Sequence, residues 1–162
     1  MSPTLHLLCG KVASGKSTLA DRLAAGPNTV LLREDAWLSS LFGKDMHTLK
    51  DYVEYSGRLK QAIAPHVVAL LKNGTSVVLD FQANTMDARA WMRDLVEQAG
   101  CEHVLHVLDI PDAVCKARLR QRNAAGAHEF SVTEEQFERI SAHFQRPAEN
   151  EGFNLEIHRD PS

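Results

Sequence analysis

Cysteine is scarce in this sequence and follows no ligand or disulfide pattern. The 162 residues include three cysteines, Cys9, Cys101 and Cys115, and no Cys-x-x-Cys pair. An odd, unpatterned set fits reduced, buried thiols better than a disulfide framework or a zinc site. The apolar fraction of 44% is sufficient for a hydrophobic core, so we expect folding without disulfides or a structural metal.

Long apolar runs and a strong net charge are also missing. No run approaches the roughly 20 residues of a membrane-spanning helix, and the first apolar run, residues 5–9, leads into a Gly-rich loop rather than a signal-peptide cleavage site. We therefore expect a cytoplasmic protein with no membrane partner. The formal net charge of −3 argues against a long nucleic-acid partner, which needs a basic stripe. It leaves room for a basic pocket that holds one small anion.

Internal repeats, low-complexity tracts and linkers are absent from the sequence, so we expect one domain over residues 1–162. Apolar runs alternate with helical patterns, which is typical of a parallel sheet covered by helices. The expected strands are residues 4–9, 29–32, 76–79, 104–110 and, at the sheet edge, 155–158.

Helix ends can be read from capping residues. Thr48 with Asp51, and Thr133 with Gln136, form capping boxes, and Thr85 can cap a further helix. The expected helices are residues 17–25, 48–73 with a kink or restart at Pro65, 85–99, one from about 112, and 133–144. Residues 123–131 should form a mobile loop.

A phosphate-binding motif follows the first expected strand. Residues 10–17 read Gly-Lys-Val-Ala-Ser-Gly-Lys-Ser and match G-x-x-x-x-G-K-[ST]. Glycines let the backbone wrap closely around phosphate oxygens, and the next helix directs its free N–H groups at them. The motif predicts a nucleotide site formed by Gly10, Ala13, Ser14, Gly15, Lys16, Ser17 and Thr18.

Within this motif, Lys16 would place its charge between the β- and γ-phosphates, and the Ser17 hydroxyl would bind Mg²⁺, which prefers oxygen ligands. The sequence contains no Asn-Lys-x-Asp element, by which GTPases read guanine. We therefore expect ATP, with Mg²⁺, rather than GTP. The short chain favours a nucleoside-monophosphate or small-molecule kinase over a ring-forming ATPase.

Two carboxylates follow expected strands. Asp35 comes after the second strand and can accept the proton of an attacking hydroxyl; its alternative role is to cap a helix. Asp80 ends the strand Ser-Val-Val-Leu-Asp and is a second anchor for Mg²⁺; its alternative role is to form a turn.

Arginines gather on the helix that begins near Asp112. Arg118 and Arg122 are four residues apart and share a face, so both can reach the phosphates and stabilise charge on a transferring phosphoryl group. Their alternative is a solvated basic face. The neighbouring loop favours a lid over the nucleotide.

Taken together, these segments resemble small bacterial P-loop kinases. Residues 10–18, Glu34-Asp35-x-Trp37-Leu38, Val78-Leu79-Asp80 and Arg118-Leu119-x-x-Arg122-Asn123 recur in that group. More distant similarity extends to gluconate kinase, chloramphenicol phosphotransferase, zeta toxins and the kinase part of phage polynucleotide kinase.

The resemblance implies a fold and a set of roles. The fold is a three-layer P-loop NTPase like nucleoside-monophosphate kinases, with a five-stranded parallel sheet and a helical lid at about residues 112–144. Lys16 and Ser17 would serve ATP and Mg²⁺, Asp35 would activate the acceptor hydroxyl, and the lid arginines would touch phosphates. One departure stands out: Asp80 is followed by Phe-Gln-Ala-Asn, where nucleoside-monophosphate kinases carry Gly and then Arg, which argues against a nucleotide acceptor.

Further arginines and aromatic residues are candidate acceptor contacts. Arg58 can flank the acceptor crevice, and Arg89 can hold an anionic acceptor, although a solvated helix surface is the expected place for Arg89. Trp37 is expected in the core, and Tyr52 can wall the acceptor pocket. The eight histidines show no ligand spacing.

The sequence favours an ATP- and Mg²⁺-dependent kinase that acts on a hydroxyl of a small molecule. The alternatives are a polynucleotide 5′-hydroxyl kinase and a non-catalytic nucleotide-binding regulatory protein.

Overall fold

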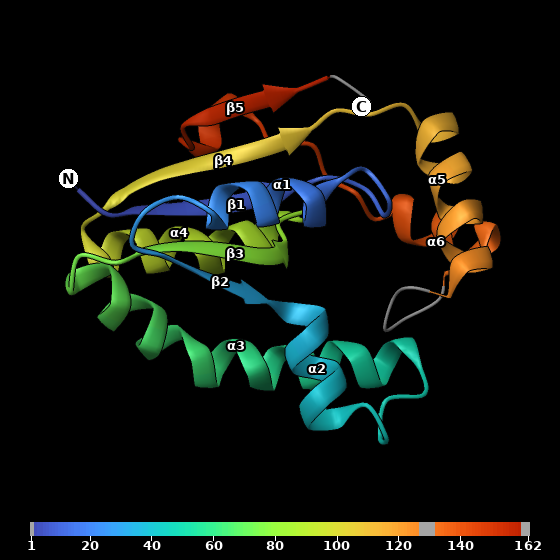
Figure 1. Cartoon of the computed structure of the whole chain (residues 1–162), viewed down its shortest axis with the longest axis horizontal. Coiled ribbons are helices and arrows are strands. Elements are labelled where there is room, and N and C mark those ends of the chain that lie inside the picture. Colours follow the sequence, from blue (N-terminus) through green and yellow to red (C-terminus); the bar gives the residue numbers. More distant parts are fainter. Residues whose placement is uncertain (1, 127–131, 160–162) are drawn as a thin grey trace.

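Five parallel strands form the centre of the molecule. The computed structural model describes residues 2–126 and 132–159. The strands are β1 (Thr4–Cys9), β2 (Thr29–Arg33), β3 (Ser76–Gln82), β4 (Glu102–Leu108) and β5 (Leu155–His158). They lie in the order β2-β3-β1-β4-β5, and every neighbouring pair is parallel (Figure 1). The expected five-stranded parallel sheet is confirmed.

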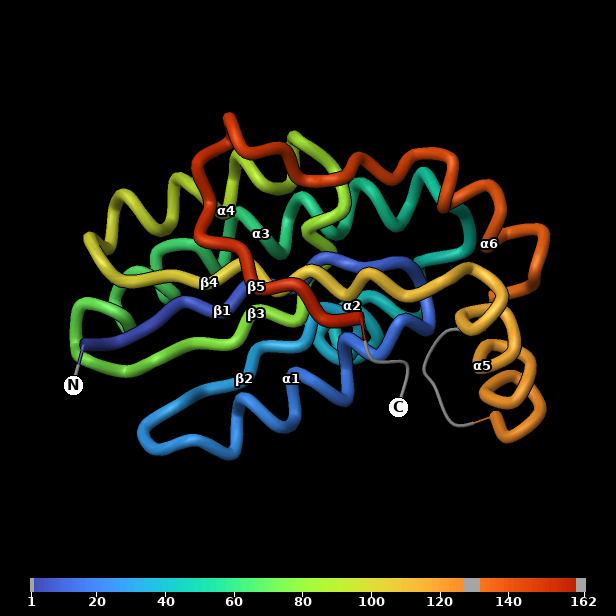
Figure 2. The backbone as a smooth tube through the Cα atoms, turned by 90° about the horizontal axis from the view of Figure 1, so that it is seen from above, coloured from blue at the N-terminus to red at the C-terminus, as the bar shows by residue number. Residues whose placement is uncertain are grey.

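Helices cover both faces of this sheet, as Figure 2 shows from above. They are α1 (Lys16–Ala24), α2 (Glu34–Phe42), α3 (Leu49–Lys72), α4 (Met86–Ala99), α5 (Asp112–Ala125) and α6 (Glu134–Ser141), with a 3-10 turn, η1, at Glu149–Glu151. Alternate residues of a strand point to opposite faces, which divides the core in two. Leu5 and Leu7 of β1 pack with α3 and α4, whereas Leu8 packs with α1, α5 and α6.

Local sequence signals set most of the helix ends. The Thr48 hydroxyl accepts a hydrogen bond from the Asp51 N–H at 3.1 Å, and the Asp51 carboxylate accepts from the Thr48 N–H at 3.2 Å. Thr133 and Gln136 form the same capping box, and Thr85 caps α4. These three predictions are confirmed.

Several boundaries differ from expectation. Helix α3 does not restart at Pro65 but continues through it, because the buried face on both sides of the proline packs on the sheet. Strand β3 continues to Gln82, so Asp80 lies within the strand and not at its end. Helix α5 reaches Ala125 and α6 stops at Ser141. The rest of the expected mobile loop, residues 127–131, lies outside the described part of the chain.

All three cysteines are free thiols; Cys9 and Cys115 are buried, as expected, whereas Cys101 is partly exposed. Across residues 2–126 and 132–159, we find no helix with the length and apolar character needed to cross a membrane. The parallel register brings the carboxyl ends of the strands to one edge of the sheet, where Arg33 of β2 pairs with Asp80 of β3. Gly10 follows β1 at this same edge.

Candidate active site

The phosphate-binding motif forms a tight loop between β1 and α1. Ala13 and Gly15 have positive φ angles of 63° and 105°, and Gly15 is the residue that precedes α1. A Cβ atom at Gly10 would lie 2.5 Å from the Ser14 Oγ and 3.1 Å from the Leu108 Cβ. Only glycine fits there, because the loop folds back on itself and on the end of β4.

Lys16 is folded back onto the loop that carries it. Its Nζ donates to the Gly10 carbonyl at 2.5 Å and to the Lys11 carbonyl at 2.9 Å. Burial lowers the pKa of Lys16, and the nearby carboxylates of Asp80 and Asp35 partly offset that effect. The ammonium group thus lies within electrostatic reach of both carboxylates singled out in the sequence.

A second cluster of charged groups surrounds Asp80. Its Oδ2 lies 3.5 Å from the Ser17 Oγ and 2.8 Å from the Nε of Arg33. Arg33 also donates to the Ser17 carbonyl at 3.2 Å and to Asp21 at 2.9 Å. Ser17 and Asp80 supply the oxygen donors that suit Mg²⁺, a hard cation that often keeps part of its water shell. Sequence analysis missed Arg33, whose role depends on the β2–β3 register.

Asp35 lies in the first turn of α2 and is exposed. Arg122 of α5 lies within electrostatic reach of this carboxylate. Burial lowers the pKa of the Arg122 guanidinium, and the negative charge of Asp35 partly offsets that effect. Among the described residues, the buried Nε of Arg122 has no hydrogen-bond partner. The structure therefore brings together two groups that are 87 positions apart in the chain.

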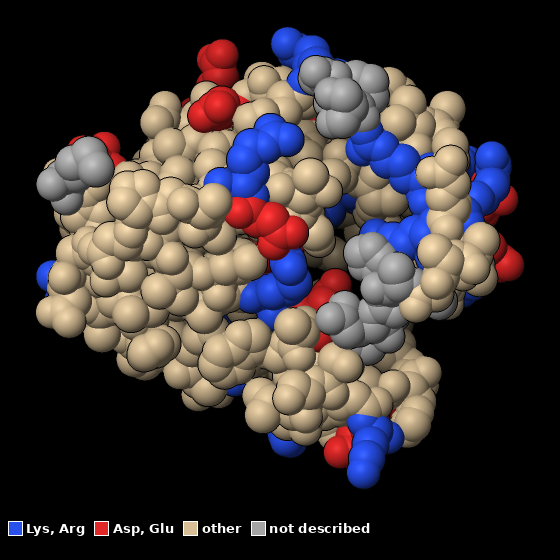
Figure 3. Space-filling view, in the orientation of Figure 1, with Lys and Arg blue, Asp and Glu red and all other residues tan. Residues whose placement is uncertain are grey.

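The other arginines of α5 behave differently from Arg122. Arg118 donates to the carbonyls of Ser14 and Ala13 at 3.1 and 3.4 Å, so it lies directly over the phosphate-binding loop. Arg120 points to solvent and pairs with Glu134 at 2.6 Å. Figure 3 shows basic and acidic side chains gathered around a hollow between the sheet and the helices on the α5 side.

Glu34 holds α2 in place beside the site. It is only 3% exposed, and its carboxylate accepts hydrogen bonds from the Tyr52 hydroxyl at 2.9 Å and from the Ser56 hydroxyl at 2.6 Å. Burial and the Glu34 charge raise the pKa of Tyr52 well above its usual value. Because successive helix residues point about 100° apart, fixing Glu34 inward directs Asp35 outward.

Asn84 forms two hydrogen bonds with Gly10, the first residue of the phosphate-binding loop. Its Oδ1 accepts from the Gly10 N–H, and its Nδ2 donates to the Gly10 carbonyl, both at 2.8 Å. This pair of bonds fixes both backbone polar groups of Gly10, whose carbonyl also accepts from Lys16. Sequence analysis noted Asn84 only as part of the departure after Asp80; a side chain four residues past that carboxylate gives no local sign of this contact.

Arg89 and Trp37 are placed elsewhere than expected, whereas the role of Arg58 stays a prediction. Arg89 is not on a solvated surface: it is 1% exposed and is bound by Glu151 at 2.7 Å and by the Ala83 carbonyl at 2.9 Å. These bonds occupy its guanidinium, which corrects its assignment to the acceptor. Arg58 is 61% exposed and pairs with Glu54. Trp37 is 40% exposed, so the expectation that it lies in the core is wrong.

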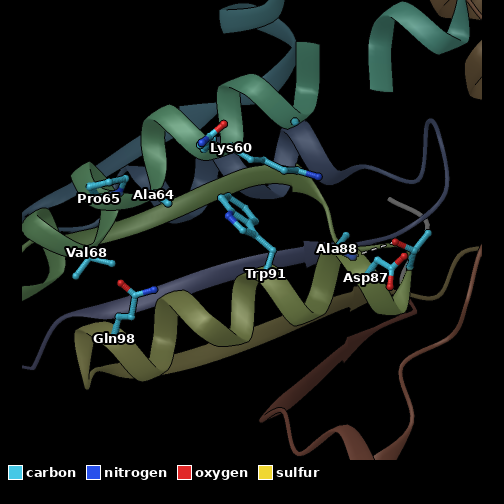
Figure 4. A pocket seen from close by; sticks show the side chains of 11 residues that line it. Lys60, Ala64, Pro65, Val68, Asp87, Ala88, Trp91 and Gln98 are labelled. Atoms are coloured by element: carbon cyan, nitrogen blue, oxygen red, sulfur yellow. Dashed lines mark hydrogen bonds between the residues drawn. The ribbon is translucent and has the colours of Figure 1, made fainter. Parts of the chain in front are cut away.

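A groove of about 820 Å³ between α3 and α4 is separate from this cluster. Figure 4 shows Trp91, Pro65 and Val68 along it, with Lys60 near Trp91. No residue of the phosphate-binding loop lines it, nor does Asp35 or Asp80. The groove therefore plays no part in the arrangement described above.

The chain matches the family described as AAA domain over residues 5–147. It belongs to that family. No curated protein sequence matches it significantly. Among solved structures, a candidate kinase from Chloroflexus aurantiacus J-10-fl has a TM-score of 0.74 at 22% identity, with 98% of this chain and 85% of that one covered.

Two further structures share the fold. The Mycobacterium tuberculosis APS kinase CysC, solved with AMPPNP and APS, has a TM-score of 0.63 at 19% identity and covers 98% of this chain and 88% of its own. A chain of the Pnkp1/Rnl/Hen1 RNA repair complex has a TM-score of 0.67 at 23% identity and covers 88% of this chain and 44% of its own. At these identities the likeness shows the fold alone: a kinase-like P-loop fold.

Proposed function

We propose that the protein is an ATP- and Mg²⁺-dependent kinase that transfers the γ-phosphate to a hydroxyl group of a small molecule. One arrangement carries the proposal: Lys16 lies on the Gly10 carbonyl of the phosphate-binding loop, the Asp80 Oδ2 lies 3.5 Å from the Ser17 Oγ, and Asp35 is exposed in the first turn of α2. A purely nucleotide-binding site needs a carboxylate on the metal side only. The exposed Asp35 of α2 is a second carboxylate, which would be available to an acceptor hydroxyl.

Each residue then has a task in the transfer. The backbone of residues 10–17 and Lys16 would hold the triphosphate, and Asn84 would keep Gly10 in position for it. Ser17 and Asp80 would hold Mg²⁺, which supplies charge neutralisation between the phosphate oxygens when bound. Asp35 would orient the acceptor hydroxyl and take its proton as the new O–P bond forms.

The arginines of α5 would act on the opposite side of the phosphate. Arg122 has a buried Nε with no partner in the described residues and faces the Asp35 charge. A guanidinium in that state can bind a transferring phosphoryl group bidentately. We place these arginines on a lid, at about residues 112–144, that would exclude water as a competing acceptor.

We further propose that residues 1–162 act as one kinase domain, in the cytoplasm where ATP is plentiful, on a small-molecule partner. Support for the single domain comes from the sheet, whose strands span the chain from Thr4 to His158. Support for a compact acceptor comes from the mixed charge around the hollow, since a long nucleic acid would need a basic channel.

The deciding experiment combines an acceptor screen with an Asp35→Asn variant. We expect ATP consumption above the water-only rate with a hydroxyl-bearing small molecule, and a drop of about 10²- to 10⁴-fold in transfer rate for Asp35→Asn. ATP binding by calorimetry should be retained. Asp45→Asn, a change at an exposed residue just beyond α2, is the matched control. Unchanged turnover in Asp35→Asn would overturn the assigned role of this residue.

A polynucleotide 5′-hydroxyl kinase is the second candidate, favoured by the shared fold with a chain of an RNA repair complex. The same screen separates the two, because a short oligonucleotide with a free 5′-hydroxyl is included as an acceptor. A non-catalytic nucleotide-binding protein is the third candidate. It would bind ATP, show no acceptor-dependent turnover, and be indifferent to Asp35→Asn.

A further inference from the structure

Three histidines form a row across neighbouring strands, away from the nucleotide site. The Nδ1 of His6 on β1 lies 3.0 Å from the Nε2 of His106 on β4, and the Nδ1 of His106 lies 3.1 Å from the Nε2 of His158 on β5. Strand pairing places them side by side: His106 is level with Leu8, two residues from His6 and on the same face. Sequence spacing could not show this row, because its members come from three separate strands.

Glu156 completes a group of possible metal ligands at one end of the row. It pairs with His106 in the β4–β5 register and precedes His158 by two residues, so all three side chains share a face. Its carboxylate oxygens lie 3.9 Å from the His106 Nδ1 and 3.7 Å from the His158 Nε2. Two nitrogens and one carboxylate thus converge on one point.

The surroundings of this group suit a ligand that enters from solvent. The His106 side chain is 3% exposed, His158 is 28% exposed and Glu156 is 58% exposed. The inner imidazole is therefore held firmly while the outer carboxylate is free to adjust. Helix α1 lies over β1, β2 and β3 (Figure 1), so the β4–β5 side of this face stays accessible through Glu156.

The contact with His6 sets the tautomer of the inner imidazole. Metal coordination requires an unprotonated ring nitrogen that faces the ion. The His6 Nδ1 lies 3.0 Å from the His106 Nε2 and can accept its N–H, which leaves the His106 Nδ1 free of a proton.

We propose that the His106 Nδ1, the His158 Nε2 and the Glu156 carboxylate bind one Zn²⁺ ion. With Zn–N bonds of about 2.0–2.1 Å, tetrahedral ligand atoms lie about 3.3 Å apart. The observed 3.1 Å between the two nitrogens and 3.7 and 3.9 Å to the carboxylate need only small side-chain rotations to reach that spacing. Water would fill the fourth position.

Binding requires no net loss of protons. The His106 Nδ1 and the His158 Nε2 lie within hydrogen-bond distance; with His106 protonated at Nε2, His158 is the donor of that bond. On coordination, His158 moves its proton to Nδ1 and both facing nitrogens become ligands. The ion would then cross-link the four-residue edge strand β5 to β4, which stabilises the last strand of the sheet.

This zinc site is separate from the kinase proposal. Ser17 and Asp80 offer hard oxygen donors, whereas the β4–β5 site offers two imidazoles and one carboxylate. Excess Mg²⁺ should occupy the first and leave the second free. The two proposals can therefore fail independently.

The test is a titration of the untagged full chain with Co²⁺, as a coloured substitute, and with Zn²⁺, in excess Mg²⁺ and without nucleotide. We expect one equivalent of Co²⁺ with a visible d–d absorption band, displaced by Zn²⁺, and a Zn²⁺-dependent rise in Tm. His158→Ala and Glu156→Gln should each weaken Zn²⁺ at least tenfold and abolish the Tm shift. His66→Ala, at an exposed histidine of α3, is the matched control and should bind as the wild type does.

Three results would overturn the proposal: no saturable binding of one equivalent, unchanged affinity in both ligand variants, or an equal loss in His66→Ala. Glu156→Gln guards against a folding artefact, because this exposed side chain contributes little to packing. Circular dichroism of each variant checks that the fold is retained before affinities are compared.

Discussion

Arg89 and Arg122 are both drawn away from water, but their surroundings differ. Arg89, between α4 and η1, is bound on all sides: Glu151 accepts from its Nε and Nη2, and the Ala83 carbonyl accepts from its Nη1. Arg122 on α5 faces the charge of Asp35, and its buried Nε has no partner in the described residues. A fully bonded buried charge holds structure together, whereas an incompletely bonded one is ready for a ligand.

The largest expected effect is on stability, at Arg89. Arg89→Met leaves the Glu151 carboxylate without its partner, so we expect the free energy of unfolding to fall by about 3–5 kcal/mol. Activity per folded molecule should change little. Urea denaturation and active-site titration measure the two quantities.

A double variant tests the reason for that loss. Arg89→Met with Glu151→Gln removes both charges and should recover part of the stability, because no unpaired charge remains. Additive losses in the double variant would show that packing, and not the ion pair, dominates at this position.

The opposite pattern is expected at Arg122. Arg122→Met should lower kcat about 10²- to 10³-fold, as for removal of one group that stabilises transition-state charge. It should leave the free energy of unfolding within about 0.5 kcal/mol, since no hydrogen bond to its Nε is lost. Arg120→Met, at the exposed partner of Glu134, is the control. Equal kcat values for Arg122→Met and Arg120→Met would contradict a role of Arg122 in phosphoryl transfer. The difference drawn here between Arg89 and Arg122 would then not hold.

Asn84 connects the two regions, since it follows Ala83, the partner of Arg89, and binds Gly10. Asn84→Ala removes the bonds to the N–H and to the carbonyl of Gly10, each worth about 0.5–1.5 kcal/mol. We expect nucleotide affinity to fall about tenfold and stability to fall by about 1–3 kcal/mol. Calorimetry with ATP and Mg²⁺ and urea denaturation provide the readouts. A change in stability with intact affinity would show that the loop holds its shape without Asn84.

The smallest effect concerns pH. The hydrogen bond from Arg89 holds the pKa of Glu151 below its usual value, so the folded state favours the ionised carboxylate. This contribution is fully present above the unfolded pKa of about 4.3 and is lost as the pH falls through the lower, folded pKa. Unfolding free energies of wild type and Glu151→Gln, measured from pH 6 down to pH 3, should therefore converge. A constant difference would contradict the assignment.

The sequence alone determined the features that depend on residues close together in the chain. The residue order of positions 10–17 predicts the loop between β1 and α1, because its glycines and following helix are contiguous. Three helix starts were predicted for the same reason, because a cap joins atoms only three residues apart. The capping residues are Thr48 with Asp51, Thr133 with Gln136, and Thr85.

Tertiary structure alone decided which side chains meet. The spacing of Arg118, Arg120 and Arg122 shows which share a face, but the docking of α5 decides that Arg118 lies over the loop and Arg120 in solvent. Arg89 can be buried because the carboxylate of Glu151, 62 positions later in the chain, accepts a hydrogen bond from its guanidinium. The row of His6, His106 and His158 exists only through strand pairing. Such contacts arise from the packing of segments that are distant in the sequence. The local residue pattern of one segment does not show which other segment it will contact.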